Sequence, residues 1–103
     1  MTTNRNDMII DEKFLTDNEF KPFCEDGELL FYNRFTENNH GSVTLEPWTD
    51  TIGNRHWTLR LVSSSVVELG RVSLTCGVCD TSETLKQVLE FFGVPIKLRE
   101  LYT

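Results

Sequence analysis

Residues 80–95 read DTSETLKQVLEFFGVP, and the arrangement of the rest of the chain follows from them. Their apolar members recur at i, i+3, i+4 and i+7, which is the spacing of one helix face. These members are Leu85, Val88, Leu89 and Phe92. The pattern predicts an amphipathic helix whose apolar stripe is buried against the preceding strands.

Both ends of this helix carry terminal signals. Asp80 and Glu83 have the spacing of a capping box, in which each side chain accepts a hydrogen bond from an amide of the first turn. Gly93 can adopt the left-handed conformation, Val94 can then fold back onto the helix, and Pro95 prevents continuation. We therefore expect the helix to end at this glycine.

The residues before the helix are typical of antiparallel strands. Residues 55–62 show it best, because apolar side chains at every second position from Trp57 alternate with polar ones, as in a sheet with one buried face. Asp26-Gly27 is the signal of a tight hairpin turn, and Gly70 marks a bulge or a turn. The predicted strands are 20–24, 29–35, 42–46, 55–62 and 65–76.

The remaining segments are assigned to ends and connections. We expect residues 1–8 to be frayed, 9–18 to form a short helix ended by a left-handed Asn18, and 47–54 to be a long connection. Residues 94–102 are either a last strand or an apolar tail on the core. The sequence thus predicts a single α+β domain over 1–103. It has a mainly antiparallel sheet of four to six strands, one long C-terminal helix packed on one face, and a short N-terminal helix.

Composition and charge limit the classes of function that the chain can have. The chain is 39% hydrophobic and 25% charged, which is ordinary for a globular protein, and its net charge is −6. Such an acidic chain disfavours nucleic-acid binding, which needs a basic face. No apolar run reaches the roughly 18–20 residues that span a bilayer, and the N-terminus lacks a signal-peptide pattern. We therefore expect a cytoplasmic protein that binds neither nucleic acid nor membrane.

Seven of the 16 acidic residues crowd into residues 11–28, with Lys13 and Lys21 as the bases among them. If the short helix and the first hairpin lie side by side, these carboxylates make one negative patch that can meet a basic partner or serve only solubility. A third idea is a DNA-mimic inhibitor that uses the acids of residues 7–28. The patch would comprise Asp11, Glu12, Asp17, Glu19, Glu25, Asp26 and Glu28.

The aromatic residues divide into core and uncommitted positions. Trp57 and Phe92 follow the buried parities, so we expect both in the core. For Trp48, Phe91 and Tyr102 we expect burial under the long connection or the tail, with exposure as an anchor for a partner as the alternative. Trp48 and Phe91 therefore join the acids as a possible partner surface.

Cys76-Gly77-Val78-Cys79 supports a second class of function. A CxxC between a strand and a helix is a setting for low-pKa thiols, and it is half of a common zinc ligand set. The segment resembles glutaredoxin, which implies thiol-redox chemistry, but only 24 residues follow Cys79 and Asp80 would raise its pKa. Cys24 and the histidines lack metal-ligand spacing. We therefore interpret Cys76 as a small buried apolar residue and expect no metal or cofactor.

Nothing in the sequence assembles a hydrolytic site. His40 lies in a polar loop and His56 on the polar side of a strand, and neither has an evident orienting carboxylate. We therefore expect both to be surface side chains. No nucleophile elbow, phosphate loop or dinucleotide fingerprint is present, so the sequence predicts a protein that is not an enzyme.

The layout resembles small proteins of phages and conjugative elements of gut bacteria. The matching segments are 15–20, 29–35 and 85–101, although Glu19 stands where that pattern has glycine. The resemblance implies no enzymatic activity and the binding of a host protein. We therefore expect a small acidic interaction module that binds a protein partner or forms a homo-oligomer. The alternative is a thiol-redox or zinc-binding protein centred on residues 76–79.

Overall fold

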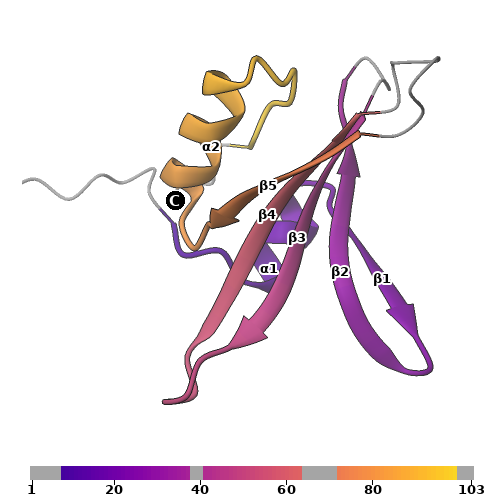
Figure 1. Ribbon diagram of the computed structural model, residues 1–103, viewed down its shortest axis with the longest axis vertical. Helices are drawn as coiled ribbons and strands as arrows, with labels where there is room; N and C mark the ends of the chain where they lie inside the picture. Colours follow the sequence, from indigo (N-terminus) through magenta and orange to yellow (C-terminus); the bar gives the residue numbers. More distant parts are fainter. Residues whose placement is uncertain (1–7, 38–40, 64–71, 100–103) are drawn as a thin grey trace, which may run out of the picture.

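A computed structural model describes residues 8–37, 41–63 and 72–99. Predictions for the first seven residues, for Gly70 and for Tyr102 lie outside these ranges. Five antiparallel strands form one sheet in the order β1-β2-β3-β4-β5, so each strand pairs with the next along the chain (Figure 1). The strands are β1 (Lys21–Glu25), β2 (Glu28–Phe35), β3 (Gly41–Thr49), β4 (Arg55–Ser63) and β5 (Val72–Val78).

The helices are α1 (Glu12–Asp17) and α2 (Ser82–Phe91). The predicted α+β class with an antiparallel sheet is therefore confirmed. The C-terminal helix was predicted to be long, which is wrong, because α2 has 10 residues. Within the described ranges, neither helix is long and apolar enough to cross a membrane.

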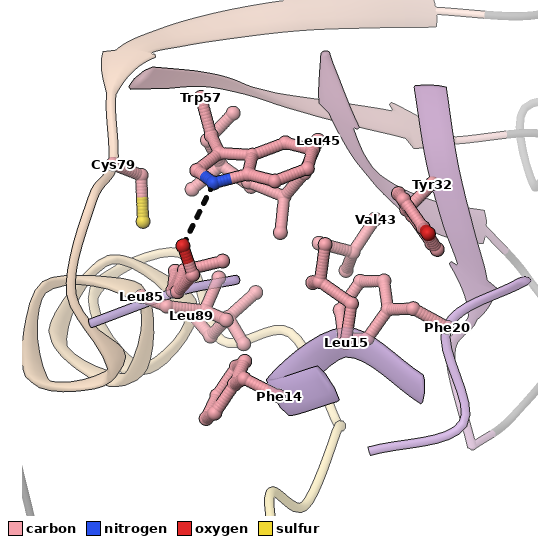
Figure 2. Packing of buried hydrophobic residues seen from close by; sticks show 12 residues of the cluster. Phe14, Leu15, Phe20, Tyr32, Val43, Leu45, Trp57, Cys79, Leu85 and Leu89 are labelled. Carbon is pink, nitrogen blue, oxygen red and sulfur yellow. Dashed lines mark hydrogen bonds between the residues drawn. The ribbon is translucent and has the colours of Figure 1, made fainter. Parts of the chain in front are cut away.

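The core lies between one face of the sheet and both helices. Figure 2 shows Trp57 and Leu45 of the sheet facing Leu85 and Leu89 of α2, with Leu15 of α1 closing the side. This arrangement follows from the sequence pattern, since the apolar parity of β4 and the apolar stripe of α2 can each leave water only by facing the other. The core also contains Ile10, Phe14, Phe20, Tyr32, Val43, Leu59 and Cys79.

The prediction that the apolar stripe of α2 extends to Phe92 is wrong. Phe92 was expected in the core, but its side chain is 46% exposed. Phe92 is the C-cap at the end of α2, and its ring lies against that of Phe91, with centroids 5.0 Å apart, rather than within the core. Leu85 and Leu89 are buried as predicted, and Val88 is partly buried.

The C-terminal signal of α2 is confirmed. Gly93 has φ of 65°, and its amide donates to the carbonyl of Glu90 at 3.1 Å. The amide of Val94 donates to the carbonyl of Leu89 at 2.8 Å, and its side chain packs against the core. These two bonds together make a Schellman motif, which satisfies carbonyls that the last turn leaves open.

The predicted capping box at the start of α2 is wrong, because the N-cap lies one residue after Asp80. Thr81 is the N-cap, and its side chain accepts from the amide of Thr84 at 3.3 Å. The carboxylate of Asp80 is not available as a cap, because it accepts a hydrogen bond from the amide of Trp57 at 3.0 Å and contacts His56. Tertiary contacts therefore displace the cap that local spacing indicated.

β3 is longer than the predicted strand, and the long connection over 47–54 is wrong. The amide and carbonyl of Trp57 bond to Asp80 and Cys79, on the side of β5. Its partner Pro47 therefore makes no hydrogen bond to β4, and its nitrogen points toward the side where β2 no longer pairs. A proline is tolerated at such an edge position, so β3 continues to Thr49.

The short N-terminal helix is present but ends differently from the prediction. Asp11 is its N-cap, accepting from the amide of Phe14 at 2.8 Å. Asn18 has φ of −103° and is fully buried, whereas Glu19 has φ of 66°. The left-handed residue is therefore Glu19, because the side chain of Asn18 is used to donate to the carbonyl of Phe14 and to accept from the amide of Arg99.

Residues 94–99 form the apolar tail rather than a strand. Their side chains at Val94, Ile96 and Leu98 pack against the core. Arg34 holds the tail in place by donating to the carbonyls of Lys97 at 2.8 Å and Asn18 at 2.9 Å. The tail therefore closes the core beside the end of α1.

We predict that Leu89→Ala lowers the free energy of unfolding by about 2–5 kcal/mol, because it leaves a cavity at a site that is 3% exposed. Lys86→Ala, on the exposed side of α2, should cost less than about 0.5 kcal/mol. Urea denaturation of both variants measures the difference. Equal losses would mean that the buried face of α2 is assigned wrongly.

We predict that Glu19→Gly stabilises the protein by up to about 1 kcal/mol. A non-glycine residue at φ of 66° carries a steric cost that glycine removes, and the gain exceeds the greater entropy of an unfolded glycine. Glu37→Gly is the control, since this exposed glutamate does not have a positive φ. A gain in the control, or a loss at Glu19, would contradict the prediction.

Candidate functional site

The face of the sheet opposite the helices, called here the outer face, carries exposed aromatic side chains. Directly paired residues of antiparallel strands point to the same side, so the pairing assigns Phe23, Phe31, Phe35 and Trp48 to this face. Phe35 is 66% exposed, Phe23 51% and Trp48 40%. The expected burial of Trp48 is therefore wrong, because the connection that was to cover it is strand β3.

The rings of Phe23 and Phe31 are stacked in the β1–β2 hairpin, with centroids 4.9 Å apart and an interplanar angle of 3°. The hairpin closes through Asp26 and Gly27, whose φ angles of 53° and 81° fit the tight turn that the sequence predicts. β2 pairs with β3 only from Tyr32 to Phe35, so the turn end of the hairpin separates from β3 and splays away from it (Figure 1). This turn end, residues 25–28, is called the acidic tip below.

The predicted acidic residues fall into two separate groups. The acidic tip holds Glu25, Asp26 and Glu28, and Figure 1 shows it pointing away from α1. The other four residues, Asp11, Glu12, Asp17 and Glu19, belong to α1 and its caps. The condition for one negative patch, a helix and hairpin lying side by side, is therefore not met by the described residues. A DNA mimic would need one such continuous array.

The two groups differ in their electrostatic environment. On α1, Asp17 pairs with Lys13 at 2.7 Å, and Asp11 is used as the N-cap. At the acidic tip Glu25 lies directly opposite Glu28, and the sequence has no lysine or arginine between residues 22 and 33. Like charges in directly opposite positions of a hairpin are destabilising. The acidic tip is therefore a local concentration of negative charge with no lysine or arginine beside it in the sequence.

Phe91 lies apart from these features. It is 82% exposed at the end of α2, where its ring makes an edge contact with Phe92 at 5.0 Å. The tail was expected to cover it, which is wrong, because the Schellman motif directs Val94 back toward Leu89 instead. Phe91 is therefore an exposed aromatic, as the partner-anchor alternative requires.

A cluster that the sequence did not reveal surrounds His56. Its Nδ1 lies 2.6 Å from Oδ2 of Asp80, and its Nε2 lies 2.8 Å from Oδ2 of Asp50. The indole of Trp48 stands beside the imidazole, with ring centroids 4.6 Å apart. The expectation that His56 lacks an orienting carboxylate is wrong. Because the partners are 6 and 24 residues away, only the hairpin register and the start of α2 bring them together.

Each carboxylate of this cluster is held by backbone amides. Asp50 begins the turn between β3 and β4, and its Oδ1 accepts from the amides of Ile52 at 3.0 Å and Asn54 at 2.9 Å. Asp80 follows β5, and its Oδ1 accepts from the amide of Trp57. An aspartate that precedes a short turn is a sequence signal for the first of these arrangements.

The electrostatics favour a charged imidazole. The hydrogen bond to Asp80, followed by that to Asp50, raises the pKa of His56 above its usual 6.5. The same contact with His56, helped by the amide of Asn54, lowers the pKa of Asp50 below 3.8. When the imidazole is charged, both ring nitrogens donate, and neither can accept a proton from a substrate. In this state His56 joins three segments of the chain through ion pairs with Asp50 and Asp80, and it does not have the free nitrogen of a general base.

The cysteines lie in an environment that opposes thiolate chemistry. Cys79 is 1% exposed, and burial, followed by Asp80 and Cys76, raises its pKa to about 12. Burial also raises the pKa of Cys76, which is partly buried against the core. In the described part of the chain, no group of three or more His, Cys, Asp or Glu side chains is arranged to hold a metal ion. The thiol-redox and zinc alternatives therefore gain no support from the geometry.

No protein-family model, curated protein or solved structure matches the chain. The resemblance to proteins of phages and conjugative elements therefore stays a prediction. Two regions remain from which a function can be inferred. They are the β1–β2 hairpin with its acidic tip and the cluster around His56.

We predict that stability depends on pH in opposite directions at the two partners of the Asp50–His56 contact. The contribution of His56 is complete below pH 6.5 and is lost as pH rises through its raised pKa. The contribution of Asp50 is complete above pH 3.8 and is lost as pH falls through its lowered pKa. Urea denaturation across pH should therefore show highest stability between these values.

His56→Gln should abolish the decline between pH 6.5 and about pH 8, where most other side chains do not titrate. His40→Gln is the matched control, since the chain has 2 histidines. It should retain the decline. A decline of the same size in the His56 variant would contradict the assignment.

Proposed function

We propose that this protein is a small acidic, non-enzymatic interaction module that binds a protein partner through the β1–β2 hairpin. The observation that carries the proposal is the stacked pair of Phe23, which is 51% exposed, and Phe31, which is partly buried. The pair lies beside an acidic tip that makes no ion pair with another described residue. Aromatic side chains next to charged groups are the usual anchors of protein interfaces. The hairpin offers both on an element whose turn end separates from β3.

The charge of the tip defines the chemistry of the partner. Three carboxylates without a neighbouring base favour a basic protein surface, and the Phe pair favours an apolar patch beside it. A homo-oligomer in which two tips meet would bring like charges together. We therefore favour a different protein as the partner over a second copy of this chain.

The arrangement of the tip is unfavourable for stability alone. Glu25 and Glu28 are directly opposite each other, with Asp26 between them in the turn. A lysine at either glutamate would convert repulsion into attraction across the strands. Proteins often retain such locally unfavourable groups where binding requires them. The cost at the tip is thus consistent with a binding role.

We predict that Glu25→Lys raises the Tm by about 1–4 °C while it weakens binding. The substitution replaces a repulsive pair with an attractive one, and it removes charge that attracts the partner. Binding to the protein captured from the native cell is measured by surface plasmon resonance. In the unaltered protein the association rate should fall as salt rises past about 0.1 M, where charges are screened beyond roughly 10 Å.

Glu90→Lys, an exposed change of the same charge on α2, is the control and should leave binding unchanged. Phe23→Ser should weaken binding by at least about tenfold, with only a small loss of Tm from the lost stacking on Phe31, whereas Phe91→Ser should leave binding unchanged. If the Phe91 variant alone loses binding, the surface lies on α2 and the proposal is wrong. Binding that is indifferent to salt and to Glu25→Lys would also overturn it.

A further inference from the structure

The cluster around His56 joins parts of the fold that the sheet leaves independent. Asp50 belongs to the turn at the end of the β3–β4 hairpin, His56 to β4, and Asp80 to the junction of β5 and α2. Among the interactions of the described residues, the imidazole of His56 alone connects the turn to this junction. The proton content of one ring therefore determines whether both contacts are made.

A neutral imidazole cannot satisfy both partners. It has one N–H donor and one lone pair, whereas the charged ring has two donors. At 2.6 Å and 2.8 Å, loss of a proton would place a lone pair against a carboxylate oxygen. One of the two contacts must then open, because the repulsion cannot be relieved at those distances.

The fold indicates which contact opens. Asp80 is held on several sides, since its carboxylate also accepts from Trp57 and its backbone carbonyl accepts from Ile10 at 2.8 Å. Apart from its contact with His56, Asp50 is bound within its own turn, whose residues 51–54 are all exposed. The turn can therefore move into water without disturbing the core, while Asp80 cannot leave without breaking the link to Trp57.

Other charged groups near His56 are engaged elsewhere. On the same face, Glu46 of β3 pairs with Arg60 of β4 at 2.9 Å. Arg55, next to His56 in β4, lies over the ring of Trp57 at 5.6 Å. In the first turn of α2, Glu83 accepts from Gln87 at 3.4 Å. Within the described ranges, the titratable groups that contact the imidazole are Asp50 and Asp80.

We propose that His56 is a pH-sensitive catch: when its imidazole loses a proton, the contact with Asp50 opens and the end of the β3–β4 hairpin is released. Trp48 stays paired with His56 in the strands, but its indole lies beside the imidazole and is attracted to that ring when the ring is charged, so its side chain responds to the loss of the proton. The catch would change the exposure of an aromatic on the outer face. The proposal goes beyond the binding function and does not depend on it.

Trp48 supplies a direct readout, because a charged imidazole in contact with an indole quenches its fluorescence more than a neutral one. From about pH 5 to about pH 9, emission should rise in one step with its midpoint above 6.5. His56→Gln should abolish the step, and Trp48→Phe should remove it although Trp57 remains. His40→Gln should retain it. No step, or a step that survives His56→Gln, overturns the proposal.

Amide chemical shifts identify the contact that opens. Across the same pH range, the amides of Ile52 and Asn54, which bond to Asp50, should shift more than the amide of Trp57, which bonds to Asp80. Asp50→Asn should move the Trp48 fluorescence step to lower pH, because one of the two carboxylates that stabilise the charged imidazole is gone. A larger shift at Trp57 than at the turn, or no shift at either place, overturns the proposal.

Discussion

The hydrogen bond from the backbone of Trp57 to the carboxylate of Asp80 is the contact on which much of the fold depends. β5 contains a bulge opposite Leu59, and Gly77 there has φ of 101°. Beyond the bulge, the amide of Trp57 bonds to a side chain, while its carbonyl still accepts from the amide of Cys79 at 2.8 Å. Asp80 thus ends the sheet and places the chain at the start of α2.

The same contact brings the N-terminal segment to α2. The indole of Trp57 donates to the carbonyl of Ile10 at 2.9 Å (Figure 2). The amide of Ile10 in turn donates to the carbonyl of Asp80 at 2.8 Å. A buried indole N–H without an acceptor would cost about 1–3 kcal/mol. The acceptor and the packing of Trp57 therefore stabilise the arrangement together. The acidic tip lies far from this centre, at the free end of another hairpin.

Much of the fold could be predicted from local pattern, because adjacent residues decide it. The buried positions Leu85 and Leu89 follow from helical periodicity, and the ends at Gly93 and Asp26-Gly27 follow from glycine in the left-handed region. The extension of β3 through Pro47 could not be read this way. It depends on where β2 stops pairing, which no local signal reports.

The candidate site, like the fold, could be predicted from the sequence only in part. Its acidic residues and aromatic residues are visible in the sequence, since composition and charge do not depend on folding. Whether they form one surface depends on distances between elements, and the structure separates the acids of α1 from those of the acidic tip. The partners of His56 were also beyond the sequence, because Asp50 and Asp80 reach one imidazole only after a hairpin and a bulged strand have set their positions. The chemistry of a side chain is set by its residue type, whereas the partners of that side chain depend on how strands far apart in the chain pack together.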